Sequence, residues 1–126
     1  MTQKEQTGAS NETLFVGIDL GTSRSSITAS NKCTAWIESY VGWPKDFISA
    51  RVLGKPVMFG AEALEHRLSL EMCRPMDRGV IKEGIDRSED AVKEIIQELI
   101  RLVNPNPGQQ IKAIVGVPAD TMKSKQ

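Results

Sequence analysis

The sequence contains few of the residues that build metal centres and nucleophilic sites. Among its 126 residues there are two cysteines and one histidine. Cys33 and Cys73 form no Cys-x-x-Cys pair, so neither a zinc site nor a Cys/His catalytic pair is indicated. We expect both cysteines to be small core residues in a reducing compartment. We expect His66, which lies between Glu65 and Arg67, to be on the surface.

The chain also lacks an excess of charge and a long apolar run. Sixteen basic and sixteen acidic residues give a formal net charge of zero, which argues against a nucleic-acid partner held by bulk electrostatics. No apolar run approaches the ~20 residues that a membrane-spanning helix needs. Residues 1–13 are polar and lack the apolar core of a secretion signal. We therefore expect a cytoplasmic protein without direct membrane insertion, whose residues 1–13 form a disordered leader.

Two common phosphate-binding motifs are absent. There is no G-x-x-x-x-G-K-[ST] sequence, which excludes a P-loop. Gly17 and Gly21 are four positions apart, which excludes the dinucleotide motif G-x-G-x-x-G. No helix is expected directly after Gly21, so a phosphate bound there would be held by a hairpin turn.

The length suits about one small domain, and 40% hydrophobic with 25% charged residues is ordinary for a soluble globular protein. Strands are expected near residues 14–19, 25–30 and 34–40 as an antiparallel meander. Residues 47–53 and 57–59 are expected to pair as short strands. A helix is expected near residues 61–68, where Ala61, Leu64 and Leu68 recur at helical spacing.

The clearest helix is expected at residues 88–103. Its apolar stripe consists of Val92, Ile95, Ile96, Leu99, Ile100 and Val103, with Ser88 as its N-cap. A buried strand is then expected at residues 111–117. The helix supplies the crossover that a parallel strand pairing requires. Residues 119–121 are expected to begin a further helix.

One stretch combines an apolar strand with a polar turn. Residues 14–20 are apolar except for Asp19, and Gly21, Thr22 and Ser23 follow at once. A carboxylate at a strand tip beside a turn of amides and hydroxyls suits Mg²⁺ and a polyphosphate. An ordinary hairpin, in which Asp19 caps its own turn and Gly21 supplies an unusual backbone angle, is equally consistent with these residues.

The order of several segments resembles the actin-like ATPase superfamily. Residues 16–23 (Val-Gly-Ile-Asp-Leu-Gly-Thr-Ser) are similar to its first phosphate loop. Arg74-Pro75 with residues 79–81, and then residues 114–118, resemble segments of bacterial shape-determining actins. Residues 41–46, 53–56 and 60–63 resemble most the magnetosome filament proteins, a bacterial actin-like type. The matches are in the same order and span residues 14–119.

This resemblance implies a ribonuclease-H-like α/β fold with a mixed sheet. Residues 14–42 and 80–126 would form an incomplete first large subdomain, and residues 43–79 an inserted small one. It further implies that Asp19 orders Mg²⁺ through water, and that Gly21, Thr22 and Ser23 contact the phosphates of ATP. Arg24 adds positive charge beside the phosphates or faces solvent.

The resemblance also implies that half of the nucleotide site is missing. Relatives close the site with a second glycine-rich loop and an adenosine-binding segment, and neither is expected before Gln126. ATP hydrolysis is therefore expected of a longer protein, with catalytic residues downstream of Gln126. We expect the chain to be truncated and to bind ATP weakly.

Three functions remain open at this stage. The first is the N-terminal part of a cytoskeletal ATPase that self-associates into filaments and organises magnetosomes. The second is a truncated interaction module whose partner is a full-length actin-like subunit. The third is a small-molecule kinase of the same superfamily.

Overall fold

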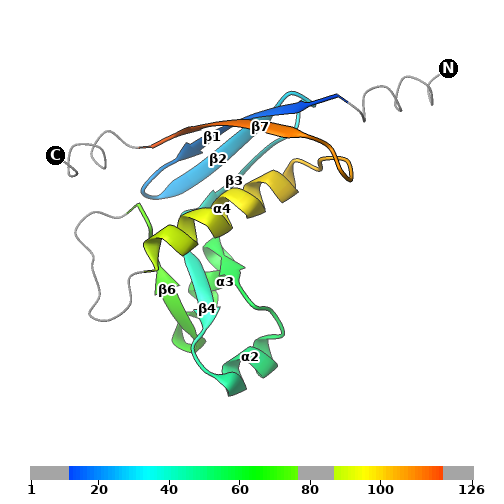
Figure 1. The fold of residues 1–126 in the computed structure, drawn as a ribbon. Helices are drawn as coiled ribbons and strands as arrows, with labels where there is room; N and C mark the ends of the chain where they lie inside the picture. Colours follow the sequence, from blue (N-terminus) through cyan, green and yellow to red (C-terminus); the bar gives the residue numbers. More distant parts are fainter. Residues whose placement is uncertain (1–11, 77–86, 118–126) are drawn as a thin grey trace.

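The computed structural model describes residues 12–76 and 87–117. Its elements follow one another along the chain as shown in Figure 1. They are β1 (Leu14–Leu20), β2 (Arg24–Ala29), β3 (Thr34–Glu38), β4 (Val41–Pro44), α2 (Phe47–Leu53), β5 (Met58–Phe59), α3 (Gly60–Glu65), a 3₁₀ turn (Arg67–Ser69), β6 (Leu70–Cys73), α4 (Ser88–Leu102) and β7 (Ile111–Gly116).

The first sheet has the strand order β3-β2-β1-β7. β1, β2 and β3 form an antiparallel meander, and β7 pairs with β1 in parallel. The carboxyl ends of β1 and β7 therefore lie side by side, with Asp19 in register with Gly116. The expected mixed sheet with an antiparallel meander is confirmed.

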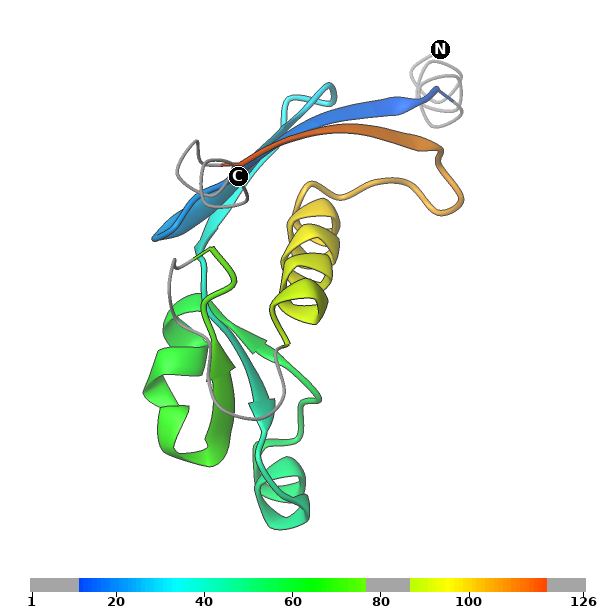
Figure 2. The ribbon, with the colours of Figure 1, turned by 60° about the vertical axis from the view of Figure 1, so that its left-hand side comes forward.

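Helix α4 covers one face of this sheet (Figure 2). Ala91, Ile95, Leu99 and Val103 are fully buried against it. On β1, the alternate residues Leu14, Val16, Ile18 and Leu20 supply the facing half of the core. The period of 3.6 in the helix and the period of two in the strand thus bring two apolar surfaces together. The predicted apolar stripe is confirmed, because its other members (Val92, Ile96 and Ile100) also pack on this core.

The second sheet has the order β5-β4-β6 and a small core of its own. Met58, Ala63 and Leu70 are buried there, with Leu53 and Met72 packed against them. Val41, the first residue of β4, belongs instead to the main core and joins the two sheets. The start of α4 is fixed to the second sheet by Arg87, whose guanidinium lies 3.6 Å from the Trp43 ring centroid and 3.1 Å from Glu71.

Several expectations in the middle of the chain are wrong. Residues 47–53 are not a strand but the helix α2. Its first turn is capped by Asp46, which accepts a hydrogen bond from the Ser49 amide, and it ends at Gly54 with φ 71°. The helix expected at residues 61–68 ends at Glu65. The residue of this helix that is buried in the small core is Ala63, whereas Leu68 lies beyond the helix and is 81% exposed. Strands β4 and β6 were not predicted at all.

Two expectations about α4 and β7 also need correction. Arg87, and not Ser88, occupies the N-cap position of α4, and no side chain caps it. The strand at residues 111–116 is present, but it is an edge strand and not a buried one. Ile114 is 82% exposed in this chain.

Other expectations agree with the structure or are not tested by it. Cys33 and Cys73 are partly buried and pack beside the main core, and His66 is exposed. Residues 1–11 and the expected helix at residues 119–121 lie outside the described residues. The division into subdomains 14–42, 80–126 and 43–79 stays a prediction. Among the described helices, none has the length and apolar character that crossing a membrane would require.

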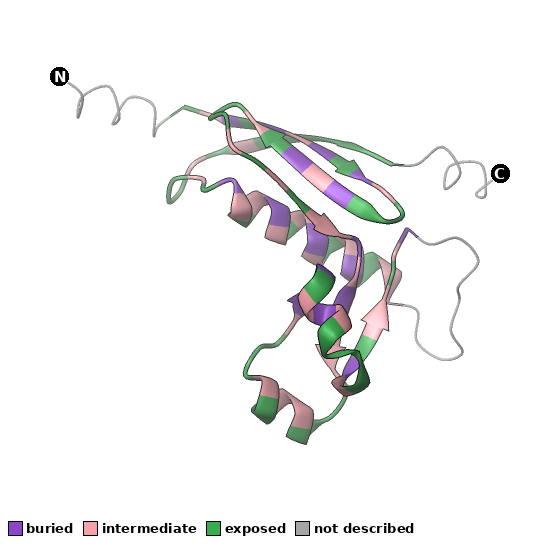
Figure 3. Cartoon of the chain, turned by 180° about the vertical axis from the view of Figure 1, so that it is seen from behind, coloured by how far each residue is buried: buried purple, intermediate pink, exposed green. Residues whose placement is uncertain are grey.

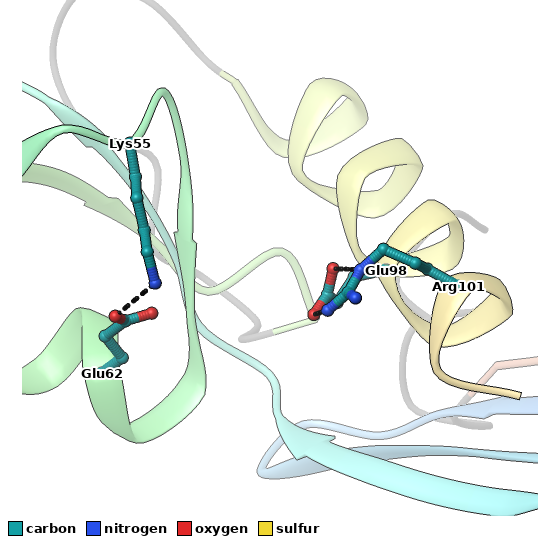
Figure 4. Close-up of polar contacts among 4 residues, drawn as sticks. All are labelled: Lys55, Glu62, Glu98 and Arg101. Atoms are coloured by element: carbon teal, nitrogen blue, oxygen red, sulfur yellow. Dashed lines mark hydrogen bonds and ion pairs between the residues drawn. The ribbon is translucent and has the colours of Figure 1, made fainter. Parts of the chain in front are cut away.

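Two ion pairs on the surface involve residues of α3 and α4 (Figure 4). Lys55 bonds to Glu62 at 2.7 Å, and Arg101 bonds to Glu98 at 2.6 Å one turn earlier on α4. Arg101 lies in the last turn, where a positive charge complements the helix dipole. Its pKa is raised by the hydrogen bond to Glu98. Surface pairs of this kind contribute little to stability.

Candidate functional site

The turn between β1 and β2 is tight, and Gly21 makes it possible. The Gly21 amide donates to the Arg24 carbonyl at 3.1 Å. A Cβ atom at residue 21 would lie 2.4 Å from that carbonyl oxygen, so a side chain is excluded by the close approach. Gly21 is absent from the described residues with positive φ, so the unusual backbone angle considered from the sequence is not its role.

The carbonyl groups of this turn are all bonded to other parts of the protein. The Gly21 oxygen accepts from the Ser39 hydroxyl at 2.7 Å. The Thr22 oxygen accepts from Nη2 of Arg74 at 3.4 Å, and the Ser23 oxygen accepts from the Ser39 amide at 3.0 Å. The acceptors of the turn are therefore already used by the fold.

Two amide donors of the same turn remain available, whereas the Gly21 amide is bonded to the Arg24 carbonyl. Within residues 12–76 and 87–117, the amides of Thr22 and Ser23 form no hydrogen bond. Both residues are exposed, and their hydroxyl groups lie in the same turn. A short segment whose acceptors are bonded and which keeps two unpaired amides is suited to an anion with several oxygens, such as a phosphate chain.

Asp19 lies on the face of the sheet that α4 does not cover. It alternates with the buried residues Ile18 and Leu20 and is exposed. Its register partners are Ser26 on β2 and Gly116 on β7. Because Gly116 has no side chain, the register partner of Asp19 on β7 places no side chain opposite the carboxylate. Asp19 forms no ion pair with the described residues, so its oxygens are available to a cation.

The chemistry of these donors fits a magnesium–polyphosphate complex better than a metal held by protein alone. Among the described residues, no group of three or more His, Cys, Asp or Glu side chains could hold an ion. Mg²⁺ commonly keeps several waters and binds through one or two carboxylates together with phosphate oxygens. One carboxylate beside free amides meets that requirement.

Arg24 stands at the end of the turn, where the structure gives it a definite partner. Its guanidinium lies 4.4 Å from the centroid of the Trp36 ring on β3. Both side chains are exposed and lie on the same uncovered face as Asp19. The structure thus places Arg24 against an aromatic ring beside the turn. A phosphate contact from Arg24 stays a prediction.

Three residues of the site were not found from the sequence. Ser25 and Ser39 are fully buried and bonded to each other at 2.7 Å, and Arg74 holds the turn from the end of β6. Arg74 was quoted for the resemblance but was given no role. Ser25 carried a signal, since it takes an inward position of β2 where an apolar residue is expected.

Comparisons with known proteins identify the class first. No family model matches the chain. Solved structures of the actin-like protein MamK superimpose on it, however. A MamK double helical filament has a TM-score of 0.73 at 36% identity, and covers 86% of this chain and 33% of that one. A non-polymerising A278D mutant of MamK bound to AMPPNP has a TM-score of 0.74 at 35% identity, with the same coverage. The chain has the actin-like fold.

Curated sequences then place the chain within that class. It is 36% identical over 115 residues to the actin-like protein MamK of Paramagnetospirillum magneticum and to that of Magnetospirillum gryphiswaldense. A MamK-like protein of the former organism is 34% identical over 104 residues. The chain is a MamK-related actin-like sequence. It spans about one third of the length of the curated relatives it matches.

Proposed function

We propose that this chain contributes one wall of a Mg-ATP site in an actin-like filament protein. The observation that carries the proposal is the state of the turn: its three carbonyls are bonded within the fold, and the amides of Thr22 and Ser23 are not. A solved relative is bound to AMPPNP, which supports a nucleotide as the ligand.

The roles follow from the positions of the residues. The Thr22 and Ser23 amides and hydroxyls bind the β- and γ-phosphate oxygens, and Gly21 permits the close approach of the backbone. Asp19 holds Mg²⁺ through its water shell. The bound cation would neutralise charge on the phosphates. Arg24 adds positive charge from its place beside Trp36. None of these residues is assigned a catalytic step in hydrolysis.

The binding proposal is tested by titrating the chain while its backbone amide resonances are recorded by NMR. This method detects the weak affinity expected when one wall acts alone. We expect Mg-AMPPNP and Mg-tripolyphosphate to shift the Thr22 and Ser23 resonances, and adenosine to leave them unchanged. The Asp19→Asn variant should bind tripolyphosphate with little dependence on Mg²⁺.

The matched control is Thr28→Ala, which removes an exposed hydroxyl from the same face of β2 at a distance from the turn. It should respond to Mg-tripolyphosphate as the unaltered chain does. Turn resonances that stay fixed at millimolar Mg-AMPPNP would contradict the proposed site. Equal responses of the turn to adenosine and to tripolyphosphate would contradict a phosphate role.

We also propose that the protein self-associates into cytoplasmic, cytoskeletal filaments that organise magnetosomes. The support is the likeness to MamK, which forms a double helical filament. Sedimentation and electron microscopy with Mg-ATP test this on the chain joined to any further sequence that its gene encodes. Filaments that pellet with Mg-ATP are expected. A protein that stays monomeric at all concentrations would contradict the proposal.

A second candidate function is the modulation of a longer actin-like subunit. The favouring observation is the edge strand β7, whose Ile114 is 82% exposed, in a chain that spans one third of its relatives. Adding the chain to a polymerising MamK-type protein should slow or cap assembly. Unchanged polymerisation at a molar excess of the chain would argue against this function.

A further inference from the structure

The turn that we propose as a phosphate site is held by two residues from outside its hairpin, Ser39 and Arg74. Ser39 lies just after β3, and Arg74 lies just after β6 in the second sheet. Together they bond all three carbonyls of residues 21–23. We call them the bracing residues.

Ser39 is fully buried, and its hydroxyl uses its one proton in a hydrogen bond to the turn. Its hydroxyl donates to the Gly21 oxygen at 2.7 Å. The Ser39 hydroxyl oxygen also lies 2.7 Å from the Ser25 hydroxyl oxygen. A hydroxyl has one proton to donate, so Ser25 must be the donor in the second bond. The Ser25–Ser39–Gly21 chain therefore runs in one direction and leaves no buried hydroxyl unpaired.

Arg74 reaches the turn from the second sheet across an aromatic ring. Its guanidinium lies 5.0 Å from the Tyr40 ring centroid and donates to the Thr22 oxygen at 3.4 Å. The ring restricts the side chain, and the guanidinium presents several donors in a fixed plane. The phosphate turn is thereby joined to the end of β6, fifty-two positions later in the chain.

These bonds set the direction of the free amides. In a trans peptide, the carbonyl of one residue and the amide of the next lie in one plane and point in opposite directions within it. No cis peptide occurs in the described chain. When Ser39 holds the Gly21 carbonyl, the Thr22 amide must point away from Ser39. When Arg74 holds the Thr22 carbonyl, the Ser23 amide must point away from Arg74.

We propose that Ser39 and Arg74 are positioning residues, which aim the Thr22 and Ser23 amides at the phosphate chain by fixing the carbonyls behind them. This inference rests on the proposed Mg-ATP site. Each amide has its own positioning residue. Ser39 fixes the direction of the Thr22 N–H bond, and Arg74 fixes the direction of the Ser23 N–H bond.

The test compares Arg74→Ala and Ser39→Ala with a matched arginine control, Arg87→Ala. Arg87 also stacks on an aromatic ring, Trp43, but it is bonded to Glu71 and not to the turn. Affinity for Mg-tripolyphosphate and the ¹⁵N relaxation of the Thr22 and Ser23 amides without ligand are measured. Arg74 is exposed, so its replacement leaves the core intact.

Arg74→Ala should weaken Mg-tripolyphosphate binding about three- to tenfold, the range that one hydrogen bond accounts for. It should also increase the mobility of the Ser23 amide before any ligand is added, which loss of charge alone would not do. Arg74→Lys should restore part of both, and Ser39→Ala should act mainly on the Thr22 amide. Arg87→Ala should change neither quantity.

The outcomes separate this inference from the function on which it rests. If the unaltered chain responds at the turn while Arg74→Ala keeps the same affinity and the same Ser23 mobility, the positioning role is wrong and the phosphate site stands. If the turn of the unaltered chain does not respond to Mg-tripolyphosphate, both are wrong. Thermal unfolding of Ser39→Ala is recorded first. If that variant does not fold, the Arg74 results alone decide.

Discussion

The two faces of the first sheet differ in burial and in the residues they carry, although the same strands form both. The inner face of β1 is buried beneath α4 at Leu14, Val16, Ile18 and Leu20. The outer face carries Asp19 and leaves Phe15 56% and Ile114 82% exposed. Figure 3 shows the alternation of buried and exposed residues along the strands. One face holds the fold together, and the proposed chemistry lies on the other and at its edge.

The largest effect should come from breaking the inner face. Ile95→Ala removes a fully buried side chain from α4 and should lower the free energy of unfolding by about 2–5 kcal/mol, because a cavity remains. The same change at Ile114 on the outer side should stay within about 0.5 kcal/mol. Denaturant unfolding of both variants measures the contrast. Equal losses would show that the outer face is not free in this chain.

The next effect should come from the turn between β1 and β2. Gly21→Ala places a Cβ atom 2.4 Å from the Arg24 backbone oxygen, so the backbone must shift. We expect a loss of about 1–3 kcal/mol in unfolding free energy and weaker Mg-tripolyphosphate binding. Gly17→Ala on the same strand meets only the Thr28 hydroxyl at 3.5 Å. That control should be neutral or stabilising by up to about 1 kcal/mol, and a similar loss in both variants would contradict the close-approach argument.

A smaller and local effect concerns α2, which has no buried residue and depends on its cap. The hydrogen bond from the Ser49 amide lowers the pKa of Asp46 below its ordinary value of 3.8. A lowered carboxyl pKa adds stability above the ordinary value, and this stability is lost as pH falls through the lowered one. Chemical shifts of residues 47–53 should therefore lose helical character only at strongly acid pH.

In the Asp46→Ala variant, α2 should be frayed at neutral pH, and its shifts should no longer follow this acid transition. Helix α4, which is held by packing and has no side-chain cap, should keep its shifts in both proteins through the same pH window. An Asp46→Ala variant with the pH profile of the unaltered chain would show that the cap does not hold α2.

The smallest effect should come from a surface ion pair. Lys55 and Glu62 are 2.7 Å apart, but their side chains are 53% and 43% exposed. Lys55→Ala should change the unfolding free energy by no more than ~0.5 kcal/mol, and added salt should remove the difference. Thermal unfolding at low and high salt measures this. A loss comparable with that of Ile95→Ala would mean that the solvent side carries more of the stability than burial indicates.

Local sequence patterns predicted the elements that pack or pair along most of their length. The α4 stripe, the β1–β2 hairpin and the parallel pairing of β7 follow from periodicity and chain connection. The second sheet did not follow, because β5 has two residues and β4 pairs with strands on both sides that come later in the chain. Helix α2 was mistaken for a strand because its apolar residues Phe47 and Ile48 suit either structure, and its cap at Asp46 was overlooked.

In the candidate site, too, the residues close together in sequence could be predicted and the distant ones could not. Asp19, Gly21, Thr22 and Ser23 lie within five consecutive residues and could be predicted as a phosphate turn. The bracing residues could not, because Ser39 and Arg74 reach the turn from eighteen and fifty-two positions away. Their contribution is visible only when the carbonyl partners of the turn are known. Sequence reasoning found the groups that would touch the ligand and missed those that aim them.

The central claim is that phosphates and metal meet between the turn and Asp19. Paramagnetic broadening with Mn²⁺ in place of Mg²⁺ tests it most directly, because broadening falls off steeply with distance from the ion. With Mn-ATP, the amides of Asp19, Thr22, Ser23 and Gly116 should broaden first, and those of α2 and α3 should stay sharp. Broadening that begins at the acidic residues of α4, or that is the same with Mn²⁺ alone, would contradict the account.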